Sequence, residues 1–119
     1  MGESVEGIGG VFFRARDPDA LRAWYAQHLG IEMEDYGTTF TATGGDQTVW
    51  APFPADTDYF GRDQQLRVNF RVRDLDAMLA QLRAAGVEVD GRVEEHAYGR
   101  FGWATDVEGN RFELWQPPQ

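Results

Sequence analysis

An internal repeat constrains this chain more than any other feature of its sequence. The eight residues that begin at Phe13, FRARDPDA, match the eight that begin at Phe70, FRVRDLDA, at six positions, with an offset of 57 residues (70 − 13). The match resumes after a one-residue deletion, where GIEM at 30–33 meets GVEV at 86–89. Self-similarity on this scale is typical of a duplicated supersecondary unit. In a chain of 119 residues, two such copies are expected to share one domain.

Each copy has the pattern of a strand, then a helix, then further strands. The first strands are predicted over residues 8–16 and 66–73, and the second alternates apolar with polar side chains. Asp17, followed by proline, and Asp74 are predicted helix N-caps, and Gly30 and Gly86 are predicted helix stops. The strands predicted after the helices are 31–36, 38–43, 47–53, 87–93, 102–106 and 111–116.

Apolar spacing assigns a buried stripe to each helix and divides the chain into modules. The predicted stripes are Leu21, Trp24, Tyr25 and Leu29 in the first helix and Leu75, Met78, Leu79 and Leu82 in the second. We expect a single domain over residues 1–119, with module one at about 8–53, a Pro- and Gly-containing linker at about 54–64, and module two at about 65–116.

Composition excludes several classes of protein. Twenty acidic against 11 basic residues give a net charge of −9, which repels phosphate backbones and anionic lipid surfaces, so neither nucleic acid nor membrane is an expected partner. The chain has no cysteine, which excludes disulfides, thiolate metal sites and a cysteine nucleophile. The N-terminus lacks the features of a secretory signal, and no apolar run is long enough to span a bilayer. The sequence therefore predicts a soluble, cytoplasmic protein.

Three segments resemble the glyoxalase/bleomycin-resistance/dioxygenase family, also called the vicinal oxygen chelate superfamily. They are GGVFFRARD at 9–17, with Trp24-Tyr25 and Leu29-Gly30 after it, NFRVRDLD at 69–76, and DVEGNRFELW at 106–115. The resemblance implies an α+β fold in which two tandem βαβββ modules form a curved, cup-shaped mixed sheet with helices on the convex face. It also implies a homodimer, and a cup that is formed either within one chain or across two.

The resemblance further implies where a divalent metal would bind, and this chain departs from that pattern. Metalloenzymes of the family hold the metal with His, Gln or Glu side chains from the first and last strands of the modules. Those positions correspond here to Gly10, Arg67, Val49 and Glu113, of which only Glu113 is a metal-binding residue type. We therefore predict no cofactor, and a divalent metal only under the alternative interpretation given below.

We hypothesise that an ion pair of Arg67 and Glu113 takes the place of the metal, because a buried carboxylate needs a compensating partner. The alternative is that the two residues make unrelated surface salt bridges. Aromatic and arginine side chains would suit a flat or anionic small molecule, although such clusters are also common in cores and dimer contacts. The candidate ligand-binding residues are Phe12, Arg67, Asn69, Tyr98, Arg100, Trp103, Glu113 and Trp115.

Three functions remain open on the sequence. The first is metal-free binding of a small, anionic or aromatic molecule, as in bleomycin-resistance proteins. The second is a lyase (lactoylglutathione-lyase-like), isomerase or dioxygenase with a metal recruited by Glu113 and by His96 or Glu95. The third is metal-free catalysis, with Glu113 as general base and Arg67 stabilising an oxyanion; it ranks last because an adjacent arginine lowers the basicity that the glutamate needs.

Overall fold

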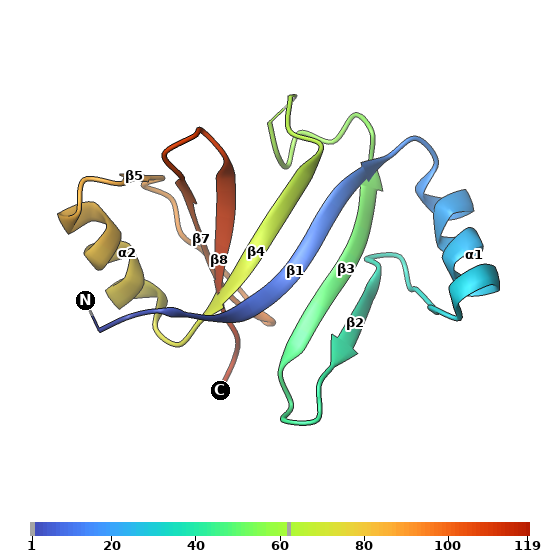
Figure 1. Cartoon of the computed structure of the whole chain (residues 1–119), viewed down its shortest axis with the longest axis horizontal. Coiled ribbons are helices and arrows are strands. Elements are labelled where there is room, and N and C mark those ends of the chain that lie inside the picture. Colours follow the sequence, from blue (N-terminus) through green and yellow to red (C-terminus); the bar gives the residue numbers. More distant parts are fainter. Residues whose placement is uncertain (1, 62) are drawn as a thin grey trace. The chain divides into compact units, whose positions relative to one another are not determined.

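The computed structural model describes residues 2–61 and 63–119, which form two helices and eight strands (Figure 1). In chain order the elements are β1 (Val5–Ala15), α1 (Pro18–Leu29), β2 (Thr38–Thr41), β3 (Gln47–Pro54), β4 (Leu66–Val72), α2 (Leu75–Ala84), β5 (Glu88–Val89), β6 (Glu94–His96), β7 (Gly99–Thr105) and β8 (Arg111–Gln116). They belong to two compact units. Unit one comprises the described residues of Met1–Gly9 and Val68–Gln119, and unit two those of Gly10–Arg67.

Unit one is built around the packing of α2 on one face of its strands. The strand order is β4-β8-β7-β5, with β6 also paired to β7; β4 and β8 are parallel and the other pairs are antiparallel. The Asp74 side chain caps α2 by accepting from the backbone N–H of Ala77 at 3.0 Å. The core cluster consists of Val72, Leu75, Met78, Leu79 and Leu114. The predicted α2 stripe is thus confirmed for the three residues that it contributes to this cluster.

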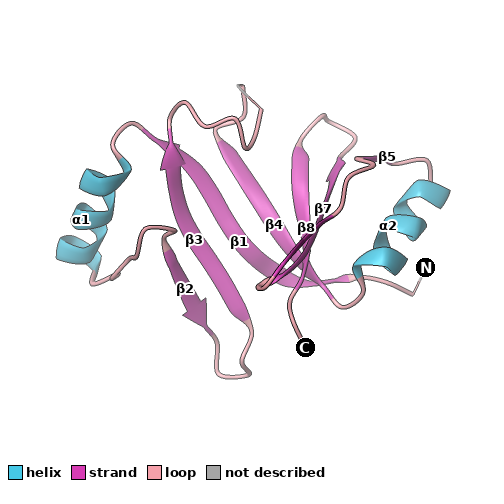
Figure 2. Ribbon diagram, turned by 180° about the vertical axis from the view of Figure 1, so that it is seen from behind, coloured by secondary structure: helices cyan, strands magenta, loops and turns pink. Residues whose placement is uncertain are grey.

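Unit two has the strand order β2-β3-β1, with β1 and β3 parallel and α1 beside β3 (Figure 2). The predicted caps of α1 are confirmed: Asp17 accepts from Ala20, and Gly30 ends the helix in the left-handed conformation with φ 68°. The predicted buried stripe is wrong. Every residue of α1 is described and none is buried, with Trp24 48% and Leu29 59% exposed. Tyr25 contacts Trp50 of β3, whereas Trp24 packs on His28 of its own helix.

The strands predicted directly after the helices are the other main correction. Residues 31–36 form no strand, since their one pairing is an isolated bridge between Glu34 and Gly37. The segment predicted at 87–93 is reduced to β5, while β6 forms where no strand was predicted. A short apolar run becomes a strand only where a neighbour accepts its ladder hydrogen bonds, and that neighbour is not visible in the local sequence.

The α+β class and the order of strand, helix and strands in each copy are confirmed. Neither described helix has the length and apolar character needed to cross a membrane.

Candidate functional site

Glu113 lies in a polar row that crosses three neighbouring strands of unit one. In the ladder, Asn69 of β4 is directly opposite Glu113 of β8, which is directly opposite Trp103 of β7. Asn69 Nδ2 donates to Glu113 Oε1 at 2.6 Å, and Trp103 Nε1 donates to Glu113 Oε2 at 2.9 Å. The exposed fractions of Asn69, Glu113 and Trp103 are 2%, 0% and 1%. Both carboxyl oxygens of Glu113 therefore accept hydrogen bonds in a buried site.

Strand alternation places this row on the face of the strands opposite α2. Phe70 and Leu114 pack in the α2 core, and a side chain on Gly102 would meet Leu75 and Leu79. Their neighbours Asn69, Glu113 and Trp103 must then point to the other face. Trp115, two residues after Glu113, shares that face and is 7% exposed.

The glycine at position 9 gives the row its space. A Cβ atom on Gly9 would lie 2.2 Å from Asn69 Oδ1 and 2.7 Å from Trp115 Cε3, closer than packed atoms can approach. In the described part of the chain, Asn69 Oδ1 is a buried acceptor that receives no hydrogen bond. The side-chain amide of Asn69 thus donates its hydrogen bond to Glu113, while its carbonyl oxygen packs against the backbone of Gly9.

In unit two, the ring of Phe12 occupies the space that a side chain at position 10 would need. A Cβ atom on Gly10 would lie 2.9 Å and 3.1 Å from Phe12 Cε1 and Cζ, and 3.2 Å from the Val49 carbonyl oxygen. Gly10 is also the direct ladder partner of Val49. The family resemblance assigns the metal ligands of the first module to positions 10 and 49. Neither Gly10 nor Val49 has a side chain that can bind a metal, and the Phe12 ring fills the space beside Gly10.

The residues present do not fit the metal that the resemblance implies. Metal sites built from nitrogen and oxygen ligands need at least three converging side chains. Within residues 2–61 and 63–119, no three His, Asp or Glu side chains converge in this way. His96 instead lies 3.2 Å from Glu94, and Glu95 is 73% exposed with its carboxylate 3.9 Å from Arg100.

Arg67 is buried against aromatic rings of its own unit. Its guanidinium carbon lies 4.8 Å from the ring centroid of Tyr59 and 5.5 Å from that of Phe60, and the residue is 2% exposed. These are cation–π distances. Tyr59 in turn stacks on Phe53, with ring centroids 5.5 Å apart. Arg67, Tyr59 and Phe53 therefore form a continuous stack.

Arg100 and Tyr98 lie apart from the buried row. Arg100 is on the α2 side of β7, where its guanidinium lies 3.0 Å from Asp76 Oδ1. The hydrogen bond with Asp76 raises the pKa of Arg100, and the same bond lowers the pKa of Asp76. Tyr98 is 61% exposed. Of the eight candidate residues, Asn69, Trp103 and Glu113 are joined by hydrogen bonds. Arg100 lies on the opposite face of the strands, the face that α2 covers.

Arg14 is the residue that sequence reasoning missed. Its guanidinium donates to five backbone carbonyl oxygens of the segment that follows β3: Ala55 and Thr57 at 2.8 Å, Phe60 at 2.9 Å, Gly61 at 2.8 Å and Gln64 at 3.0 Å. It also lies over the ring of Phe60, 4.7 Å from the centroid. The signal was present in the repeat, which has arginine at 14 and again at 71, 57 residues later.

Comparisons with known proteins agree with this architecture. A family model described as glyoxalase-like domain matches residues 10–115. Comparison of the sequence with curated proteins gives no match. Among solved structures, methylmalonyl-CoA epimerase from Mycobacterium tuberculosis is 24% identical with a TM-score of 0.73, covering 100% of this chain and 93% of that one.

Two further structures share the fold at lower identity. A variant of the Streptomyces coelicolor methylmalonyl-CoA epimerase in complex with 2-nitronate-propionyl-CoA is 19% identical with a TM-score of 0.74, covering 98% of this chain and 100% of that one. A Legionella pneumophila structure described as NAD-dependent benzaldehyde dehydrogenase is 14% identical with a TM-score of 0.63, covering 92% and 98%. Such different names on one fold show that the fold alone assigns no activity. By its family model and its fold, the chain belongs to the glyoxalase-like domain family, within the vicinal oxygen chelate superfamily.

Proposed function

We propose that the protein binds a small aromatic or anionic molecule without a metal ion at Glu113. The observation that carries the proposal is the state of the Glu113 carboxyl group, whose two oxygens already accept hydrogen bonds from Asn69 and Trp103 in a buried row. A metal at this carboxyl group would have to share oxygens that these two buried donors already engage. A site built from nitrogen and oxygen ligands needs at least three converging side chains, and among the described residues no second or third His, Asp or Glu converges with Glu113.

The first module also supports the proposal, because the positions at which a metal ligand is expected there have no suitable side chain. Position 10 offers no donor, and a substituted side chain there would have to displace the Phe12 ring. Its ladder partner Val49 is apolar. Neither residue is one that a divalent cation binds.

The cations of the chain favour an anionic group on the ligand. All 11 basic residues are arginine, and the sequence contains no lysine. Guanidinium groups remain charged at every physiological pH and bind carboxylates or phosphates through paired N–H donors. The similar epimerase structure in complex with 2-nitronate-propionyl-CoA supports a small-molecule ligand for this fold.

The catalytic alternatives lack such support. A general base must reach the proton that it removes, and Glu113 is 0% exposed with both oxygens engaged. The non-standard metal ligands that sequence reasoning considered, His96 and Glu95, are directed to Glu94 and Arg100 respectively.

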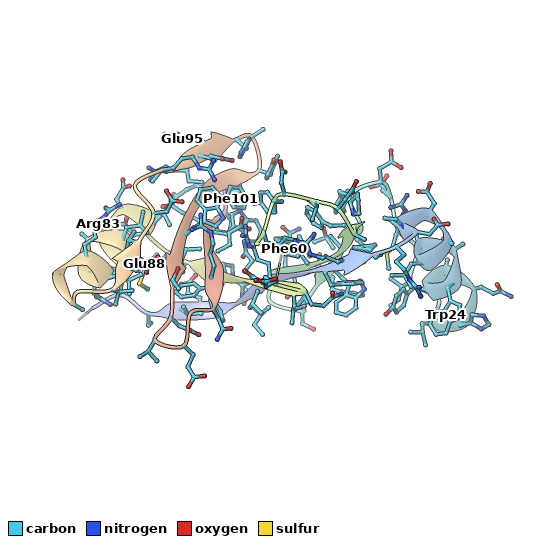
Figure 3. All side chains as sticks on the ribbon, turned by 90° about the horizontal axis from the view of Figure 1, so that it is seen from above. Trp24, Phe60, Arg83, Glu88, Glu95 and Phe101 are labelled. Carbon is cyan, nitrogen blue, oxygen red and sulfur yellow. The ribbon has the colours of Figure 1, made fainter. Side chains whose placement is uncertain are left out.

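We also propose that the protein acts as a homodimer. The side chains of Trp24 and Leu29 on α1 are apolar and exposed, and self-association buries side chains of this kind. Figure 3 marks Trp24 on α1. Sedimentation velocity over a range of protein concentrations tests this directly, and a single monomeric species at every concentration would contradict it.

Metal analysis tests the central proposal. The protein, purified without a metal-affinity tag, is equilibrated with Zn²⁺, Mn²⁺ or Ni²⁺ and then desalted, and its metal content is measured beside that of Glu113→Gln. We expect substoichiometric metal in both proteins. Glu113→Gln is the matched control because glutamine keeps the length and the acceptor for Trp103 but not the negative charge. Stoichiometric metal in the wild type that is lost in Glu113→Gln would overturn the proposal.

Ligand binding is tested separately by thermal shift and calorimetry with benzoate, naphthoate and their saturated analogues. We expect naphthoate to stabilise the folded protein, because it combines a flat ring with a carboxylate. A panel in which no aromatic or anionic compound binds would contradict this part of the proposal.

A further inference from the structure

Three aromatic side chains form an ordered cluster at the edge of unit one, which we call the ring edge: His96, Tyr98 and Phe101. The rings of His96 and Tyr98 are parallel within 1°, with centroids 4.9 Å apart. Phe101 meets both of them edge-on, at 5.7 Å and 5.6 Å. Figure 3 marks Phe101 on β7, whose partner strand β6 carries His96.

The backbone beneath the ring edge is fixed by Trp115. The indole N–H of Trp115 donates to the Tyr98 carbonyl oxygen at 2.9 Å, and Trp115 itself is 7% exposed. Gly99 follows with φ 132°, a conformation that favours glycine, and a Cβ atom there would lie 2.4 Å from the indole nitrogen. A buried tryptophan thus sets the turn from which Tyr98 projects.

The charged groups around the ring edge are paired with one another. Glu94 lies 3.2 Å from His96 and 3.5 Å from Arg92, and Arg100 is paired with Asp76 on the other side of β7. The most exposed ring of the edge is that of Tyr98, 61% exposed. This surface complements a flat apolar ring, which extends the parallel stack that His96 and Tyr98 have begun.

We propose that the ring edge is the part of the protein that recognises its ligand, by stacking a planar aromatic ring on Tyr98. This proposal rests on the proposed function, because it names the class of small molecule that the protein binds and the surface that selects it. Any anionic group on the ligand is a substituent of that ring.

Proton NMR gives a site-specific test, because the chain has only two histidines, His28 and His96. The probe is naphthoate, and the control compound is its fully saturated analogue, which keeps the charge but has no planar ring. A ring stacked on Tyr98 is expected to shift the imidazole resonances of His96 and to leave those of His28, which packs on Trp24 of α1, unchanged. The saturated analogue is expected to shift neither histidine.

Variants separate stacking from general stability. Tyr98→Phe keeps the ring and is expected to bind naphthoate as the wild type does, whereas Tyr98→Leu is expected to bind about fivefold more weakly. Tyr36→Leu is the matched control, since Tyr36 is a tyrosine of unit two that is 51% exposed, and its substitution should leave the affinity unchanged.

The outcomes distinguish this proposal from the proposed function. Naphthoate binding that shifts neither histidine and persists in Tyr98→Leu overturns the ring edge but leaves metal-free ligand binding intact. Stoichiometric metal at Glu113 overturns the proposed function, whatever the histidines report. A His96 resonance that moves with protein concentration in the absence of probe shows a second copy of the chain on this edge, and also overturns the proposal.

Discussion

The five hydrogen bonds that Arg14 makes to backbone carbonyls predict that this side chain determines the shape of the segment after β3. Replacing Arg14 with alanine removes all five donors and the contact with the Phe60 ring. Each hydrogen bond from a charged donor contributes about 1.5–3 kcal/mol where it is buried, and less here because several of these carbonyls are solvated. We expect Arg14→Ala to lower the free energy of unfolding by about 2–4 kcal/mol, well below the simple sum.

Lysine is not a conservative replacement at this position. The carbonyls of Ala55, Thr57, Phe60, Gly61 and Gln64 are arranged around a planar fork, and an ammonium group has three donors at one point. Arg14→Lys should therefore recover less than half of the lost stability. Arg16→Ala is the control, because Arg16 is exposed and its removal should cost less than about 0.5 kcal/mol.

Adding free guanidinium ion to Arg14→Ala tests whether the guanidinium group itself accounts for the lost stability. If guanidinium ion binds the vacated carbonyls of Arg14→Ala with a Kd of about 10 mM, then 50 mM should restore about 1 kcal/mol, while wild type and Arg16→Ala gain nothing. Urea denaturation measures stability, and cleavage by chymotrypsin at Tyr59, which is 37% exposed, reports on the segment itself. Arg14→Ala that loses less than about 0.5 kcal/mol, or that is not rescued, refutes the account.

Two more perturbations follow from the packing and from the charges. Gly10→Ala should destabilise the fold by about 1–3 kcal/mol because its Cβ meets the Phe12 ring, and Phe12→Leu in the same chain should recover part of that loss in a double-mutant cycle of unfolding free energies. The hydrogen bond from Arg111, together with that from the Arg92 backbone, lowers the pKa of Asp90. The stability that this ionised carboxylate contributes is fully present above the ordinary pKa of about 3.9 and is lost as pH falls through the lower folded-state value. Acid titration of Asp90→Asn should therefore show a shallower loss of stability below about pH 4, and an unchanged profile would contradict this assignment.

Local signals in the sequence predicted the architecture where they reflect local physics. The Asp17 and Asp74 caps and the helix end at Gly30 are set by backbone groups within a few residues, and the structure has all three. The strand predicted at 111–116 is found with the same bounds as β8. The α1 stripe failed because apolar spacing shows which residues share a helix face, but not whether a neighbouring element covers that face.

The candidate site was predictable by residue type and only in part by contact. The sequence indicated that Glu113 needs a buried partner, and the structure supplies Asn69 and Trp103, both of which were among the candidates. Their role depends on which residues of three strands are directly opposite, and the repeat offset alone does not determine that register. The repeat marks Arg14 through its equivalent Arg71, but it does not identify the acceptors of Arg14, which are backbone carbonyls and have no sequence signature.

The polar row of unit one also has a consequence for how its strands align during folding. If β8 slipped by one residue, Glu113 would turn toward Leu114's place beneath α2, in a cluster of apolar side chains. A slip of two residues along β4 would keep the face but would bring Arg71 opposite Glu113 in place of Asn69. Of these three alignments, only the native one gives Glu113 both of its neutral donors, Asn69 and Trp103. A buried glutamate can therefore select the native strand pairing over alignments shifted by one or two residues, even if it adds little to the net free energy of folding.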